Sequence, residues 1–227
     1  MTRFPPILLI AALIAAAPLG AQTIDAPSTA VAELPAESLD PRHLGIGPWD
    51  RMSALLEVTI FNIDVLTLTV RVDSVTGERL ERVASGRSYS DALADSVAAV
   101  MLDAEELWAM QIFHRDVGFG RLIGGMTESA EKAGEAGYVS EAYVSAFSET
   151  APELFRFLEE DGTKEGDMIL FHVVGESVRT AYLTVDGQLL LNEVGEDAEG
   201  RRASVPSFFA PGSRFRERLV KSLPGVR

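Results

Sequence analysis

The fold is decided by the stretch IFHRDV at residues 112–117, which is followed almost at once by FGRLIG at residues 119–124. The first part is an apolar run that ends in the polar triplet His-Arg-Asp, as a strand does where it leaves a sheet. The second part is punctuated by glycine and continues with helix-forming residues. We therefore expect a strand over residues 107–114 and a short helix over residues 121–129.

The first 21 residues are typical of a secretory signal peptide. Arg3 supplies a short positive region, residues 7–18 form an apolar run, and small residues stand immediately before Gln22. A membrane anchor is the alternative. The apolar run, even when it is extended to Ala21, is shorter than the roughly 20 residues that a helix needs to span a bilayer. The sequence therefore favours cleavage before Gln22, with no stable membrane span afterwards.

The rest of the chain divides into a tether and one domain. Residues 22–43 hold three prolines among small and acidic residues and show no apolar period, which predicts a flexible tether. Residues 44–227 are then expected to form a single domain. Their content of Leu, Val, Ile and Phe is sufficient for a core of their own.

Composition excludes several classes of function. The chain has no cysteine, so it can form no disulfide and has no thiol nucleophile. Export without disulfides suits the periplasm or another part of a bacterial cell envelope. The 34 acidic residues outnumber the 20 Lys and Arg, which gives a formal net charge of −14. Such a charge repels nucleic acids and anionic membranes, and its ordinary role is solubility.

Apolar periods and turn residues predict strands on both sides of a helical middle. The expected strands are 55–73 (two strands or one bent strand), 79–83, 107–114, 168–174, 178–185 and 188–191; the expected helices are 91–100, 121–129, 138–160 and 213–223. Ser90 and Ser213 are expected as helix N-caps, and residues 193–202 as a charged loop. This order of elements indicates an α+β domain with an antiparallel sheet.

The motifs with known chemistry are weak. Gly118, Gly120 and Gly124 follow a strand, but their spacing misses the dinucleotide-binding pattern, so a close strand-to-helix turn is the better explanation. The three histidines lack partners at metal-ligand spacing, so we expect no metal and no cofactor. Arg115 and Asp116 could be catalytic, although adjacent opposite charges at a strand end more often make local hydrogen bonds.

Taken together, the chain resembles the chalcone isomerase family, as a bacterial exported member. The resemblance covers residues 49–224 and rests on the order of elements, on the motif at 113–123 and on the ending at 208–224. It implies an open-faced β-sandwich, in which an antiparallel sheet is covered on one side by helices. It also implies a ligand cleft between the sheet and the helical layer.

The same resemblance implies candidate site residues. The family arginine, which orients a phenolate or grips a carboxylate, falls on Arg51, and the family tyrosine falls on Tyr138. A family asparagine is replaced by Ser145, and a Thr-Met pair falls near Ser207. The strand position that carries a threonine hydroxyl in plant enzymes falls within residues 62–64, which have no hydroxyl.

These substitutions favour ligand binding over catalysis. The leading expectation is a protein that binds a small amphipathic molecule, such as a fatty acid, an aromatic carboxylate or a phenol, through Arg51, Tyr138 and Ser207. The alternative is an intramolecular lyase that closes a ring on a chalcone-like phenolic enone, with Arg51, Tyr138 and Ser145 as catalytic residues. A third possibility is a structural envelope protein whose cleft is filled by its own Phe208, Phe209 and Met168.

Overall fold

The computed structural model describes the backbone of residues 50–58 and 63–227 and the side chains from Val65 onward. The expected signal peptide (1–21), the tether (22–43) and Asn62 lie outside the described residues. The elements are β1 Asp50–Val58, β2 Ile63–Val72, α2 Ser74–Ala84, α3 Asp91–Leu102, β3 Glu106–Phe113, α4 Phe119–Glu135, α5 Glu141–Leu154, η3 Arg156–Leu158, β4 Met168–Val174, β5 Ser177–Leu183, β6 Leu189–Glu196, α6 Ala198–Ala203, η4 Pro206–Phe209 and α7 Arg216–Lys221.

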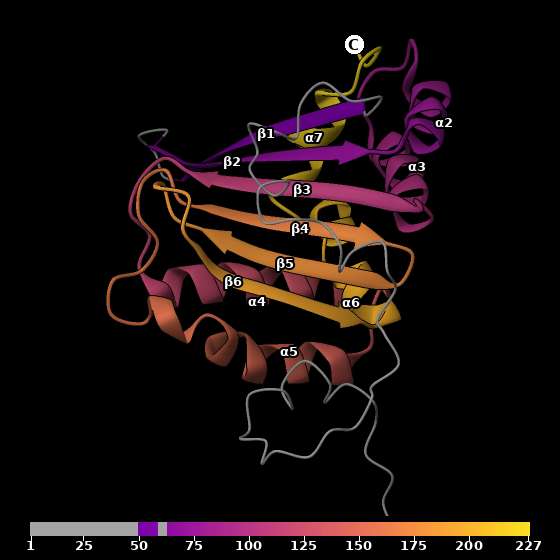
Figure 1. Ribbon diagram of the computed structural model, residues 1–227. Helices are drawn as coiled ribbons and strands as arrows, with labels where there is room; N and C mark the ends of the chain where they lie inside the picture. Colours follow the sequence, from indigo (N-terminus) through magenta and orange to yellow (C-terminus); the bar gives the residue numbers. More distant parts are fainter. Residues whose placement is uncertain (1–49, 59–62) are drawn as a thin grey trace, which may run out of the picture.

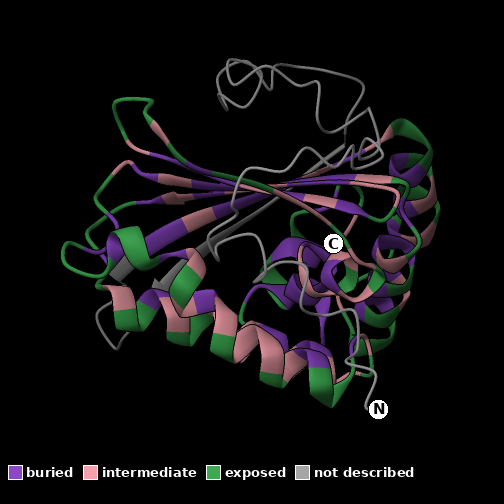
Figure 2. Ribbon diagram, turned by 60° about the horizontal axis from the view of Figure 1, so that its bottom comes forward, coloured by how far each residue is buried: buried purple, intermediate pink, exposed green. Residues whose placement is uncertain are grey.

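The strands form one antiparallel sheet in the order β1-β2-β3-β4-β5-β6. Each described strand therefore pairs with its neighbour in sequence (Figure 1). The described helices gather on one face and at one end of the sheet (Figure 2). The expected α+β class and the expected sheet covered on one side by helices are both confirmed.

The core lies between the inner face of the sheet and the helices. On β2 and β3 the inward residues alternate along the strand, and Leu68, Val70, Leu107 and Ala109 are fully buried. Helix α7 packs against β1 and α6 packs against β5 and β6, whereas α4 and α5 pack mainly on each other. Helices α4 and α5 consequently stand further from the sheet than α6 and α7 do.

Several predicted elements are confirmed with their caps. Helix α3 follows Ser90, whose side chain accepts a hydrogen bond from Leu93 N at 3.2 Å. The strand predicted over 107–114 is β3, and the two strands predicted within 55–73 are β1 and β2. The hairpin of β4 and β5 turns at Gly175, which has a positive φ of 57°.

The strand predicted over 79–83 is wrong, because residues 74–84 form helix α2. The Asp73 carboxylate accepts a hydrogen bond from Thr76 N at 2.8 Å, which caps the first turn. Thr76, Leu80 and Ala84 then lie one helical turn apart and are buried together. The Thr76-Gly77 pair is thus part of the helix and does not form a turn.

Two more boundaries differ from the prediction in the helical middle. The long helix predicted over 138–160 begins only after Ser140, whose side chain caps Tyr143 N, and it ends at Leu154. Helix α4, with 17 residues, is longer than α5, with 14. Pro152 falls in the last turn of α5 and does not divide it, because the hydrogen bond that it removes and the clash of its ring affect only the end of the helix.

The charged loop predicted over 193–202 is also wrong. Strand β6 continues to Glu196, and Asp197 caps helix α6 by accepting hydrogen bonds from Glu199 N and Gly200 N. The last helix begins at Arg216 and not at Ser213. The Ser213 side chain instead accepts a hydrogen bond from Phe215 N at 3.3 Å, one turn before the helix.

Candidate functional site

A cavity of about 740 Å³ lies between the inner face of the sheet and helices α4 and α5. Helix α6 and the turn η4 close it at one end. The cavity exists because α4 and α5 touch each other more than they touch the sheet. Its volume is within the roughly 300–1,000 Å³ that is usual for small-molecule sites.

The floor of the cavity is formed by inward residues of three neighbouring strands. Gln111 and Phe113 come from β3, Phe171 from β4, and Val178 and Thr180 from β5. Alternation along each strand places these side chains on the same face. The floor is therefore mostly apolar, with one amide and one hydroxyl.

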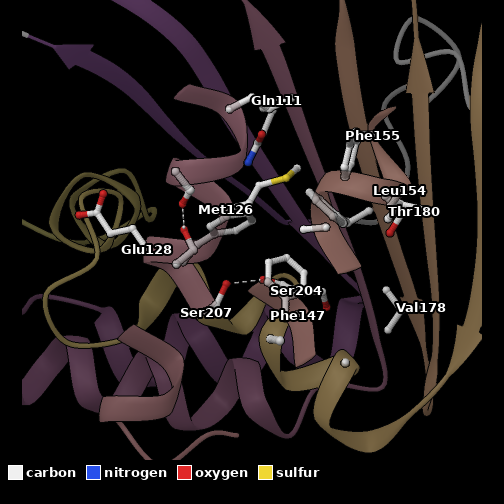
Figure 3. A pocket seen from close by; sticks show the side chains of 18 of the residues that line it. Gln111, Met126, Glu128, Phe147, Leu154, Phe155, Val178, Thr180, Ser204 and Ser207 are labelled. Carbon is white, nitrogen blue, oxygen red and sulfur yellow. Dashed lines mark hydrogen bonds between the residues drawn. The ribbon is translucent and has the colours of Figure 1, made fainter. Parts of the chain in front are cut away.

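The walls are mostly apolar as well. Leu122 and Met126 come from α4 and Phe147 and Leu154 from α5. Phe155, which directly follows α5, adds a further aromatic ring (Figure 3). Small residues between them, such as Ala146, leave the space open. An apolar molecule in this cavity would exchange water for contact with carbon-rich side chains.

Charged pairs stand along the rim of the cavity on the side of α4. Arg214 donates three hydrogen bonds to the Glu128 carboxylate, at 2.8, 3.1 and 3.3 Å, and Lys132 Nζ lies 2.8 Å from Glu135. The hydrogen bond with Glu135 raises the pKa of Lys132 above its usual value. Arg121, which is exposed, also lines the cavity. The rim therefore offers cations beside carboxylates, since Glu128, Glu153, Glu193 and Asp197 also line the cavity. The inward residues of β3, β4 and β5 include no cation among the described lining residues.

Gln111 is the unexpected residue of this site. It lies midway along the central strand β3, is only 8% exposed, and occupies an inward position between Ala109 and Phe113. In the sequence it is the one polar residue of the apolar run 107–113, and that interruption is the signal by which it could have been found. Figure 3 shows its amide beside Met126, directed toward the space between the sheet and the helices.

Of the residues expected from the family resemblance, Ser207 lines the cavity. It is 1% exposed, and its hydroxyl donates a hydrogen bond to the Ser204 carbonyl at 2.6 Å (Figure 3). Ser145 is exposed on α5, and neither it nor Tyr138 is among the residues that line the cavity. The backbone of Arg51 pairs with Arg71 in β1 and β2, but the Arg51 side chain lies outside the described residues. The roles assigned to Arg51, Tyr138 and Ser145 remain predictions.

Tyr138 instead lies in the link between α4 and α5, half-buried against the core. Burial raises its pKa, the nearby Arg216 opposes that shift, and Asp95 adds to it. The guanidinium of Arg216 is itself buried, donates hydrogen bonds to the carbonyls of Phe209 and Asp91, and pairs with Asp95. This cluster joins α3, η4 and α7, so its evident role is structural.

The polar triplet at the end of β3 also has structural partners. The His114 ring nitrogen Nε2 lies 2.7 Å from the Thr67 hydroxyl, and the Asp116 carboxylate accepts a hydrogen bond from Glu165 N at 3.0 Å. Val117 exchanges two backbone hydrogen bonds with Thr163. The expectation that Arg115 and Asp116 serve local hydrogen bonding is confirmed for Asp116.

A second polar cluster lies on the opposite face of the sheet. His172 is 2% exposed, stacks on Trp108 with ring centroids 3.6 Å apart, and places Nε2 at 2.8 Å from Glu106 Oε1. Burial lowers the pKa of His172, against the smaller opposing effect of Glu106. The imidazole is therefore neutral, with Nε2–H donating to Glu106. Its Nδ1 is then an acceptor that is buried without a partner in the chain.

The three side chains named for a self-filled cleft do not fill this cavity. Phe208 forms part of the cavity wall, and Phe209 is fully buried elsewhere in the core. Met168 packs with Trp108 and Leu170 on the opposite face of the sheet. None of these three side chains occupies the space, so the cavity remains open.

Two searches of the described residues gave no site of another kind. From Val65 onward, no group of three or more His, Asp or Glu side chains is arranged to hold a metal ion. Within the same residues, no helix combines the length and the apolar character that crossing a membrane requires.

Comparisons with known proteins add little. No protein-family model and no curated protein sequence matches the chain. Among solved structures, it is similar to the crystal structure of a fatty-acid binding protein from Arabidopsis thaliana. The two are 13% identical, the match covers 76% of this chain and 86% of that chain, and the TM-score is 0.46. A likeness of this degree carries no argument about the function of this chain.

Proposed function

We propose that this protein has the chalcone isomerase fold and binds a small amphipathic molecule in the cavity between its sheet and helices α4 and α5. The observation that carries the proposal is a mostly apolar cavity of about 740 Å³ inside an otherwise close-packed domain. Protein interiors of this size usually contain few voids larger than a water molecule, because packing contributes to stability. A space of this size with an apolar lining is therefore a candidate ligand site.

The apolar lining of the cavity favours a ligand whose main part is apolar. Phe113, Phe147, Leu154 and Phe171 offer aromatic and aliphatic carbon on opposite sides of the space. Each 100 Å² of apolar ligand surface that leaves water contributes about 2.5 kcal/mol before the cost of association is subtracted. An aliphatic chain or an aromatic ring system meets this requirement.

The charged rim selects the end of the ligand that faces solvent. Arg121 is exposed, and Arg214 and Lys132 are paired with glutamates at the surface. A carboxylate or phenolate placed there can take over or share these cations at little desolvation cost, since all three groups are in contact with water. A fatty acid, an aromatic carboxylate or a phenol fits this arrangement.

The test is binding of hexadecanoic acid to delipidated protein, measured by isothermal titration calorimetry. Ala146, on α5, lines the cavity and is half-buried, whereas Ala142 is exposed on the same helix and does not line it. Ala146→Phe should fill the cavity and weaken binding at least tenfold. Ala142→Phe makes the same change on the solvent side and should leave binding within twofold of the wild type.

Two results would contradict the proposal. The first is a wild-type protein that binds neither hexadecanoic acid nor an aromatic carboxylate such as 2-naphthoic acid. The second is equal binding by the wild type and Ala146→Phe, since that would place the ligand outside this cavity.

Export is proposed on the sequence alone. Arg3, the apolar run at 7–18 and the small residues before Gln22 support a cleaved signal peptide and a periplasmic or secreted location. Mass spectrometry of the protein from a bacterial envelope fraction should find a mature chain that begins at Gln22. A chain that retains residues 1–21 in the cytoplasm would exclude this part of the proposal.

A further inference from the structure

Gln111 occupies a position that the fold would otherwise give to an apolar residue. Its partners across the sheet are Leu68 on β2 and Ile169 on β4, both fully buried. On the same strand, the inward neighbours Ala109 and Phe113 are buried as well. A primary amide in these surroundings loses most of its contact with water, which costs free energy unless a partner replaces the water.

No described residue supplies that partner. The Gln111 side chain makes no hydrogen bond within residues 65–227, whereas other buried polar groups such as Ser207 and Asp167 do. Among the described side chains, two polar atoms are fully buried and have no hydrogen-bond partner, His172 Nδ1 and Ser177 Oγ. The Gln111 amide is not among them, so its polar atoms reach the open space of the cavity. The close-up agrees, because the amide points to that space (Figure 3).

The chemistry of the amide limits what it can bind. It presents two N–H donors and an acceptor oxygen, with no net charge. Its neighbours Leu68, Ile169 and Met126 are apolar, and the cations of the cavity stand at the rim. An ionised group buried beside Gln111 would therefore lack a counter-charge and would cost several kcal/mol. A carbonyl or a hydroxyl would pair with the amide without that cost.

We infer that Gln111 anchors an uncharged hydrogen-bonding group, a carbonyl or a hydroxyl, on the buried part of the ligand. This inference rests on the proposed function and narrows it to oxygenated amphiphiles, whose apolar body is interrupted by a neutral oxygen at the depth of the sheet. A plain saturated chain would leave the amide unpaired. Water can pair with the amide in the free protein, and the ligand oxygen replaces it on binding.

The test compares two ligands that differ in one group. Nonan-2-one carries a carbonyl oxygen where 2-methylnonane carries a methyl group, and the two have nearly the same shape. Dissociation constants for both are measured with the wild type and two variants, by titration of the ¹³C-methyl signal of Met126. Gln111→Met keeps the length of the side chain and removes the amide. Thr180→Val is the matched control, because it removes the other polar group of the floor, on β5.

The informative quantity is the ratio of ketone affinity to hydrocarbon affinity in each protein. Gln111→Met should lower this ratio about tenfold, through the loss of one hydrogen bond and the relief of an unpaired amide in the hydrocarbon complex. Thr180→Val should leave the ratio within twofold. The ligand-free Gln111→Met variant should be at least as stable as the wild type, because no protein partner of the amide is lost.

Three outcomes would overturn the inference. If both ligands bind and the affinity ratio is unchanged in Gln111→Met, Gln111 does not anchor the ligand oxygen, and the proposed function still stands. A Gln111→Met variant less stable than the wild type would show that the amide serves the fold. Failure of the wild type to bind nonan-2-one would also sink it, and the hexadecanoic acid titration then shows whether the proposed function falls with it.

Discussion

At the scale of single residues, buried polar groups differ in whether the folded chain supplies their hydrogen-bond partners. Asp167, which is 3% exposed, accepts hydrogen bonds from Lys164 N at 2.8 Å, Val185 N at 2.9 Å and the Tyr182 hydroxyl. Burial, and then the hydrogen bond to Asp167, raise the pKa of Tyr182. The Asp167 carboxylate and its donors therefore satisfy one another's hydrogen bonding within the chain. Gln111, equally deep, faces open space, and this contrast is why we read it as part of a site.

His172 gives a prediction about pH at the same scale. Burial lowers its pKa below the ordinary value of 6.5, so the folded protein disfavours the protonated form that the unfolded chain accepts freely. Stability from this residue is therefore complete above pH 6.5 and is lost as the pH falls from there through the folded pKa. Each unit of pKa difference amounts to about 1.4 kcal/mol.

We expect His172→Gln to flatten this dependence, because glutamine can still donate a hydrogen bond to Glu106 but does not titrate. The measurement is the free energy of unfolding in urea between pH 5 and pH 8, for the wild type and the variant. Identical slopes for the two proteins over this range would contradict the assignment of the pH dependence to His172.

At the scale of elements, one of the two predicted helix caps, Ser90, is confirmed, and the other, Ser213, is wrong. Ser90 marked the start of α3 correctly, and the apolar runs of β3, β4 and β5 were long and well bounded. Two other errors concern helices whose capping Asp was not recognised in the sequence. Asp73 before α2 and Asp197 before α6 both cap helices, yet the first segment was taken for a strand and the second for a loop.

The link that follows α5 depends on a glycine, and this leads to a second prediction. Gly162 has a φ of +65°, and a Cβ there would collide with the Val117 carbonyl oxygen and lie 3.0 Å from Gly118 Cα. The neighbouring Thr163 pairs with Val117 by two backbone hydrogen bonds, which hold the start of α4 in place. The close approach of the two segments requires a residue without a side chain.

Gly162→Ala should therefore lower the free energy of unfolding by at least about 3 kcal/mol, through a positive φ and a steric clash together. Gly175→Ala is the matched control, because Gly175 has a φ of +57° but open space around it, so only about 1 kcal/mol is expected. Urea denaturation midpoints give both values. Equal losses in the two variants would show that the contact with Val117 does not matter.

At the scale of the whole molecule, local patterns in the sequence predicted the architecture, whereas a cleft between the sheet and the helices was expected from the family resemblance alone. Period-two runs on both sides of a helical middle were enough for an α+β domain with an antiparallel sheet, and the family resemblance added the helices on one face. The cavity depends on how far α4 and α5 stand from the sheet, and no local pattern encodes that distance. It results from the summed sizes of residues such as Ala146 and Phe147, which only the packed structure brings together.

The candidate site shows the same limit. Family resemblance pointed to Ser207, which lines the cavity, and to Tyr138, which lies against the core beside Arg216. It gave no hint of Gln111, because a single polar residue within a strand is ambiguous until the strand is known to be central and its face is known to be inward. In the structure, Gln111 lies between the buried residues Leu68 and Ile169, and this position identifies it as a candidate ligand-binding residue.

The methionines allow the central claim, a ligand between the sheet and the α4–α5 layer, to be tested directly. Met126 lines the cavity, whereas Met110 and Met168 lie on the opposite face of the sheet. With ¹³C-methyl methionine, addition of hexadecanoic acid should shift the Met126 signal in a saturable way and leave the Met110 and Met168 signals in place. Movement of Met110 and Met168 with an unchanged Met126 would contradict the account, because the ligand would then occupy the other face.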